Sequence, residues 1–203
     1  MSLVELLVAM ALLLVVLAAI SGLWIRLQNT YVFTREDVTA QQEAQTAMTQ
    51  MVEYIRTARA PSNPPSEALG LPIVEAEPNM ITLWTDTDRD ENHALELVRF
   101  YVDTDTGTLY RKLASAETYT FPTGPGTLLV QEGQVANDVS KPLFEYTGID
   151  GSPFPTDATG TPVVNPAEIR EVQITLRIDV VPGPSPREHV LSSVVQPRNL
   201  RQY

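Results

Sequence analysis

The chain has 203 residues, 25 acidic against 14 basic side chains, a formal net charge of −11 and no cysteine. That length accommodates one ordinary domain with an appendage. The negative charge argues against a nucleic acid partner, because phosphate binding depends on Lys and Arg. Without cysteine, disulfides, thiolate metal sites and cysteine nucleophiles are excluded.

Residues 6–25 read LLVAMALLLVVLAAISGLWI, which is twenty residues without a charge. As a helix this apolar run would be about 30 Å long and would match the hydrocarbon core of a bilayer. A cleaved signal peptide would need a basic start and a shorter apolar stretch, whereas the one charged side chain before the run is Glu5. A buried core helix would need a larger protein around it. The apolar run therefore predicts a membrane-spanning helix.

Glu5 is unusual because it lies at the edge of the apolar run. An acid within a membrane is costly unless it is neutralised or paired, which makes it a candidate functional residue. Its nearest positive group would be the α-amino group of Met1. The alternative is that Glu5 lies among the headgroups as a favourable acid at a helix N-terminus. These physical arguments leave both interpretations open.

The opening residues, MSLVELLVAMA, closely resemble the mature N-terminus of type IV pilins and type II secretion pseudopilins. The resemblance implies that a leader is removed by a prepilin peptidase and that the amine of Met1 is methylated. It also implies that Glu5 pairs with the N-terminal amine of a neighbouring subunit during assembly by dedicated machinery. Met1 departs from the usual Phe of that family. The motif covers about a tenth of the chain.

A second helical pattern follows the apolar run, over residues 26–60. Its apolar residues recur in steps of four and three, the spacing of one helix face: Ala44, Met48, Met51, Ile55 and Ala58. This stripe predicts an amphipathic helix packed on a globular head. The prolines from Pro61 onward predict that the helix ends near Ala60.

Gly22 follows Ser21 inside the apolar run. Glycine in a helix interior costs about 1 kcal/mol relative to alanine, so we expect a local weak point there. Many pilins have a proline in this region, and their helix loses order nearby in the filament. The sequence predicts that the helix softens near Gly22.

The rest of the chain predicts a connecting loop over residues 61–79 and an antiparallel β head over residues 80–203. Alternating patterns predict six strands, joined in part by a hairpin at residues 103–107: 80–85, 95–103, 108–113, 143–146, 172–180 and 190–195. Pro- and Gly-rich stretches between them are expected to be solvent loops. The predicted fold class is α+β, with a long N-terminal helix whose first half spans a membrane and whose second half packs against this head.

One acidic stretch is a candidate calcium site. Asp86, Asp88 and Asp90 alternate as at the start of a calcium loop. Glu91 stands where that loop needs glycine, and Leu97 stands where it needs a bidentate glutamate. We therefore expect a solvated acidic turn and no metal or other cofactor.

No catalytic motif is found in the sequence, and its two histidines, His93 and His189, are far apart. We therefore expect a protein that is not an enzyme. The leading hypothesis is a structural subunit of a type IV pilus-like filament. It would lie in the bacterial inner membrane before assembly and in an extracellular or periplasmic filament afterwards, with identical or homologous subunits as partners.

Two alternatives remain. Segments around residues 98–101, 109–111 and 197–200 look like larger minor pseudopilins, which prime or cap a pilus or a secretion pseudopilus. A different class of protein, a single-pass anchored binding module, would tolerate changes at Glu5. The sequence does not distinguish adhesion, motility, DNA uptake and secretion.

Overall fold

The computed structural model describes residues 3–66, 69–87, 94–115, 118–155, 164–180 and 188–198. One helix, α1 (Leu3–Thr57), occupies the first 55 described residues. The chain divides into two compact units, one up to Thr39 and one from Ala40 onward, which we call the head unit. α1 ends three residues before the expected position, and the Thr57 hydroxyl there bonds to the Glu53 carbonyl at 2.9 Å.

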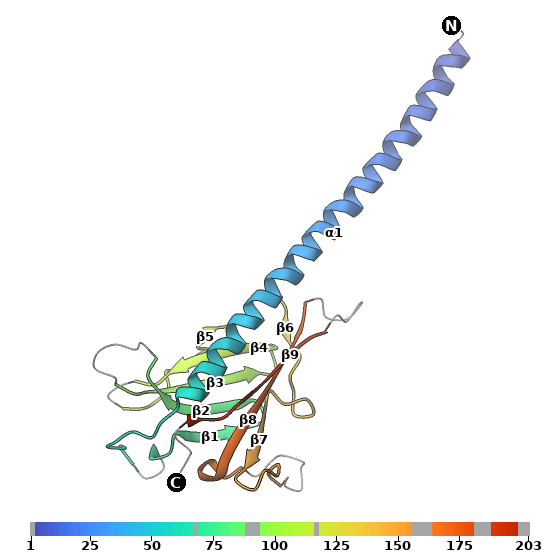
Figure 1. Ribbon diagram of the computed structural model, residues 1–203. Coiled ribbons are helices and arrows are strands. Elements are labelled where there is room, and N and C mark those ends of the chain that lie inside the picture. Colours follow the sequence, from blue (N-terminus) through green and yellow to red (C-terminus); the bar gives the residue numbers. More distant parts are fainter. Residues whose placement is uncertain are drawn as a thin grey trace. The chain divides into compact units, whose positions relative to one another are not determined.

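The first sheet of the head unit has five antiparallel strands in chain order (Figure 1). They are β1 (Ile73–Glu77), β2 (Met80–Thr85), β3 (Glu96–Asp103), β4 (Thr108–Leu113) and β5 (Thr127–Leu128). Neighbours in the sheet are thus also neighbours in sequence, as is common in antiparallel sheets.

The second sheet is built around its longest strand, β8 (Ile169–Asp179), which follows the short 3₁₀ helix η2 (Pro166–Glu168). Along one edge β8 pairs with β6 (Gln134–Val135) and β7 (Phe144–Gly148), and along the other it pairs with β9 (Glu188–Val195). All these pairings are antiparallel. The predicted α+β architecture, a long N-terminal helix followed by antiparallel sheet, is therefore confirmed.

All six predicted strands are present: β2 and β4 have the predicted boundaries, and the boundaries of the other four are shifted by up to three residues. The predicted hairpin at residues 103–107 is also present, and Gly107 there has a φ of 64°, a left-handed conformation that glycine adopts without strain. The expectation of a loop throughout residues 61–79 was wrong, because β1 lies within it. This edge strand is short and carries two glutamates between flanking prolines, so its pattern is weak. The two-residue strands β5 and β6 were also missed.

The core of the head unit lies where α1 meets the two sheets. The predicted stripe is confirmed, since all five of its residues are buried together with two more alanines: Ala40, Ala44, Ala47, Met48, Met51, Ile55 and Ala58. They share one cluster with Phe100 of β3 and with Ile174 and Leu176 of β8. Small alanines in the stripe allow the helix backbone to approach the sheets closely, while Met51 and Ile55 fill the core.

The two sheets are joined at the turn between β1 and β2. Pro78 accepts a hydrogen bond through its carbonyl from the Phe144 N–H at 2.8 Å, and the Asn79 side chain accepts one from the Leu143 N–H at 3.0 Å. From the second sheet, the buried Tyr146 hydroxyl donates to the Glu77 carbonyl at 2.9 Å. These bonds fix the start of β7 against the first sheet.

Truncation of the stripe should unfold the head unit at lower denaturant concentration. Ile55→Ala removes a fully buried side chain, and we expect it to cost about 2–5 kcal/mol of unfolding free energy. Guanidinium unfolding of the full chain in detergent, followed by the fluorescence of buried Trp84 in a Trp24→Phe background, measures this cost. Gln45→Ala on the exposed side of the same helix is the control and should change the free energy by less than about 0.5 kcal/mol. Equal effects of the two substitutions would contradict the packing described.

The burial of Tyr146 predicts that the head unit loses stability at alkaline pH. Burial raises the pKa of its hydroxyl well above the usual value, and the charge of Glu77 adds to the rise. The folded state therefore favours the protonated tyrosine. The resulting stabilisation of the folded state is fully present below the unfolded pKa of about 10, and it is lost as the pH rises through the folded pKa. Unfolding free energies measured between neutral pH and pH 11 should fall more steeply for the wild type than for Tyr146→Phe. Parallel curves would show that Tyr146 does not carry this dependence.

Candidate assembly segment

The apolar run forms the N-terminal part of α1 and is the principal candidate for function. Its side chains are exposed, including Leu14 at 65% and Trp24 at 63%. In the part of the chain that the structure describes, α1 is the one helix long and apolar enough to cross a membrane. In water, the almost uniformly apolar surface of this helical segment would be exposed to solvent. The segment therefore requires a bilayer or another protein to cover it.

The polar side chain inside the apolar run is satisfied within the helix. The Ser21 hydroxyl donates to the Leu17 carbonyl at 2.9 Å, one turn earlier. Because an α-helix also pairs its own backbone groups, the segment presents few unmet hydrogen-bonding groups to apolar surroundings.

Three residues of this segment were predicted to be functional, Met1, Glu5 and Gly22, and the structure describes them to different extents. Met1 lies outside the described residues, and Glu5 belongs to α1 although its side chain is not among those described. Gly22 lies inside the unbroken helix, and beyond its own turns no atom lies within 4 Å of where a Cβ would stand. The pairing of Glu5 and the softening near Gly22 stay predictions.

The helix is held in the head unit by polar contacts that flank the buried stripe. The Glu43 carboxylate accepts hydrogen bonds from the backbone N–H groups of Gln131 at 2.7 Å and Glu132 at 2.9 Å. Further along α1, Tyr54 accepts a bond from the Arg111 guanidinium at 3.2 Å. These bonds fix the rotation of this part of the helix relative to the sheets.

The candidate calcium loop lies only partly within the described residues. Asp86 is described, whereas Asp88 and Asp90 lie outside. Just after Asp86, the Thr87 N–H and hydroxyl donate to the Glu96 carboxylate at 2.9 and 3.1 Å. Among the described residues, no three His, Cys, Asp or Glu side chains are grouped to hold a metal ion.

Of the two histidines, His93 also lies outside the described residues. His189 is in β9 and lies 3.3 Å from the Gln41 amide nitrogen on α1. It therefore contacts the part of α1 that belongs to the head unit.

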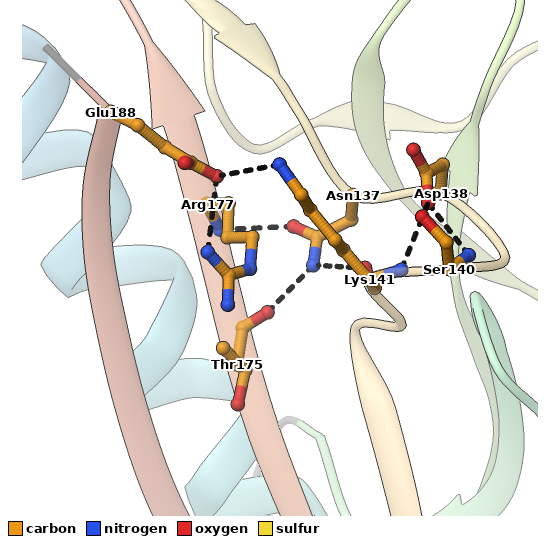
Figure 2. A network of polar contacts seen from close by, with 7 residues as sticks. All are labelled: Asn137, Asp138, Ser140, Lys141, Thr175, Arg177 and Glu188. Carbon is orange, nitrogen blue, oxygen red and sulfur yellow. Dashed lines mark hydrogen bonds and ion pairs between the residues drawn. The ribbon is translucent and has the colours of Figure 1, made fainter.

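A polar network that sequence reasoning missed braces the loop between β6 and β7 (Figure 2). Asn137 is its centre and is only 3% exposed. Its amide donates to the carbonyls of Lys141 at 3.1 Å and Thr175 at 2.7 Å, and its oxygen accepts the Arg177 N–H at 2.9 Å. One side chain thus closes the loop on itself and attaches it to β8.

The outer part of the same network is charged and exposed. Asp138 accepts bonds from the Ser140 hydroxyl at 2.7 Å and the Lys141 N–H at 2.9 Å. The Ser140 hydroxyl, followed by the Lys141 backbone, lowers the pKa of this carboxyl. Glu188 of β9 lies 3.2 Å from Arg177 and 4.0 Å from Lys141, so the loop also reaches the far strand of the sheet.

The sequence carries one signal for this loop. Asn137 and Asp138 precede Val139-Ser140-Lys141, and Asn and Asp favour turns because their side chains bond to the following backbone. That composition identifies a turn, but it does not reveal which of the two side chains is buried.

Asn137→Ala should therefore destabilise the head unit. The substitution removes the three hydrogen bonds of a buried side chain, and we expect a loss of about 2–4 kcal/mol of unfolding free energy. Ser140→Ala is the control in the same exposed turn and should cost less than about 1 kcal/mol. Denaturant unfolding of the full chain in detergent compares the two. Similar losses would show that burial of Asn137 does not set the stability of the loop.

No protein-family model matches the sequence, and no curated protein matches it. Among solved structures, the fold is similar to that of a type IV-like pilin from Thermus thermophilus, with a TM-score of 0.44 and 13% sequence identity. The alignment covers 79% of this chain and 97% of the Thermus chain.

Proposed function

We propose that this protein is a structural subunit of a type IV pilus-like filament and assembles through the apolar run of α1. One observation carries the proposal. Twenty consecutive uncharged residues form an exposed segment of α1, whereas the head unit has its own buried core. The opening motif, with Glu5 one residue before the run, supports the same function.

The physical argument concerns what covers the apolar run in each state. Before assembly, the hydrocarbon of the inner membrane surrounds it. Outside the membrane the same surface would face water, and burial against the apolar runs of neighbouring subunits removes it from water again. Helix bundling thus replaces lipid without a cofactor or a covalent bond, and the head units lie outside the cytoplasm in either state.

Glu5 and the amine of Met1 set the register of this bundle in our proposal. Inside it, an unpaired carboxylate is heavily penalised, so an axial position that brings a neighbour's amine to Glu5 is favoured. A single polar residue fixes the alignment of coiled coils in a similar way. The charge pair then specifies the stagger of the subunits more than it stabilises them.

Glu5→Ala should leave the protein in the membrane fraction and abolish filaments, because the helix remains apolar but loses its alignment signal. Electron microscopy of sheared material, together with membrane fractionation, measures both properties. Glu36→Ala removes one acid from the same helix outside the apolar run, and we expect filaments from this control. Normal filaments from Glu5→Ala would contradict the register function.

Sheared filaments also distinguish a main subunit from the two alternative functions. A minor, priming or capping subunit would be scarce in sheared filaments, whereas a main subunit would dominate them. Native protein that stays dispersed under all conditions, and that is unaffected by Glu5→Ala, would instead support a single-pass anchored binding module and overturn the filament proposal.

A further inference from the structure

The hydrogen bonds of β8 determine which backbone groups of its neighbour β9 face outward. On the edge away from β9, the Thr175 N–H donates to the Leu143 carbonyl at 2.8 Å, and the Arg177 carbonyl accepts the Ala136 N–H at 2.9 Å. The Asn137 side chain bonds to the same edge, where it takes the place of a strand between β6 and β7 (Figure 2). Because backbone groups alternate from side to side along a strand, the residues of β8 at even positions face β9.

The register between β8 and β9 carries this alternation into β9. Leu176 lies opposite Leu191, and Ile174 lies opposite Ser193. These opposed residues form hydrogen-bonded pairs, so the backbone groups of Leu191 and Ser193 face β8. The backbone groups at even positions of β9 point to the other side. We call these residues the β9 edge: Val190, Ser192 and Val194.

No strand lies beside the β9 edge in the part of the chain that the structure describes. There, β9 pairs with β8 alone, and no backbone hydrogen bond joins Val190, Ser192 or Val194 to any other segment. The side chains of Val190 and Val194 are 51% and 53% exposed, and Ser192 is exposed as well. Their N–H and carbonyl groups therefore form an open edge about 17 Å long.

The β9 edge lacks the features by which sheets block the addition of a strand. Charged side chains and prolines protect many edge strands, but residues 190–195 read VLSSVV and contain neither. The charge of Glu188, at the start of β9, is paired with Arg177 at 3.2 Å. Valine also favours extended backbone. The edge is thus a template for one more strand.

We propose that the β9 edge binds an extended segment of a partner protein, which adds a strand to the second sheet. Open N–H and carbonyl groups in a row select an extended main chain, because such a chain completes the hydrogen-bonded ladder. Side chains of the added strand would lie beside Val190 and Val194 on the exposed face of the sheet. The segment that fits is therefore uncharged and carries β-branched or other apolar residues at alternate positions.

A second copy of β9 fits this edge less well. Antiparallel pairing of two β9 edges reverses every direction in the plane of the sheet, including that of the α1 segment packed on the sheet within each head unit. Copies anchored in one membrane all point the same way. The choice of a different protein as the occupant thus rests on the proposed membrane anchoring, whereas the capacity of the edge to bind a strand does not.

Amide hydrogen exchange of the full chain in detergent, followed by NMR, tests the proposal. The probe is a synthetic strand, acetyl-KTVTVTK-amide, and the control is the same peptide with methylated backbone nitrogens, which cannot donate to the edge. Without peptide, the amides of the β9 edge should exchange fast, while those of Leu191 and Ser193 are protected. At a probe concentration of about ten times its Kd, exchange of the edge amides should slow about tenfold, because only the unbound protein exchanges.

Two variants locate the binding on β9. Ser192→Pro removes the central outward N–H at a position where an edge strand tolerates proline, and it should abolish the slowing at Val190 and Val194. Ser192→Thr keeps this N–H and should retain the slowing. The comparison of the two peptides on the wild type does not depend on the folding of either variant.

No slowing with the probe, or equal slowing with the methylated peptide, would overturn the proposal. Protection of the edge amides that needs no peptide and rises with protein concentration would overturn the choice of partner and identify a second copy as the occupant. These results are independent of filament formation, which electron microscopy of Glu5→Ala measures separately.

Discussion

Exposed apolar surface on α1 is the constraint on which the rest of this protein depends. Nothing within the unit that ends at Thr39 covers the side chains of the apolar run among the described residues. Water penalises such a surface in proportion to its area. The chain therefore needs an apolar environment from outside, first lipid and then, in our proposal, copies of itself.

Within the head unit, the same helix obtains its cover from its own chain. The stripe from Ala40 to Ala58 is buried by two antiparallel sheets, and hydrogen bonds at Glu43 and Tyr54 flank it. One helix thus contains two kinds of apolar surface. Alanine and methionine in the head unit suit close packing in a fixed core, whereas leucine and valine fill the apolar run that faces outward.

The elements with long periodic patterns could be predicted from the sequence. The stripe on α1 repeats over four turns and β8 alternates over several residue pairs, so burial on one side leaves a clear signal. β1, β5 and β6 have between two and five residues, and their pairing depends on neighbours brought close by the fold. The burial of Asn137 could not be predicted for a related reason, since its hydrogen-bond partners Thr175 and Arg177 are distant in sequence. Glu5 is predicted from its position and by resemblance, and the pairing that we propose for it depends on a second subunit.

The loop centred on Asn137 has a consequence for the way the protein matures. Hydrogen bonds close this loop, and their formation needs no chemical reagent. Covalent cross-links between thiols would instead require an oxidant and time for incorrect pairs to exchange. The head unit can therefore reach its final state in reducing and oxidising surroundings alike, independently of any thiol oxidase or isomerase.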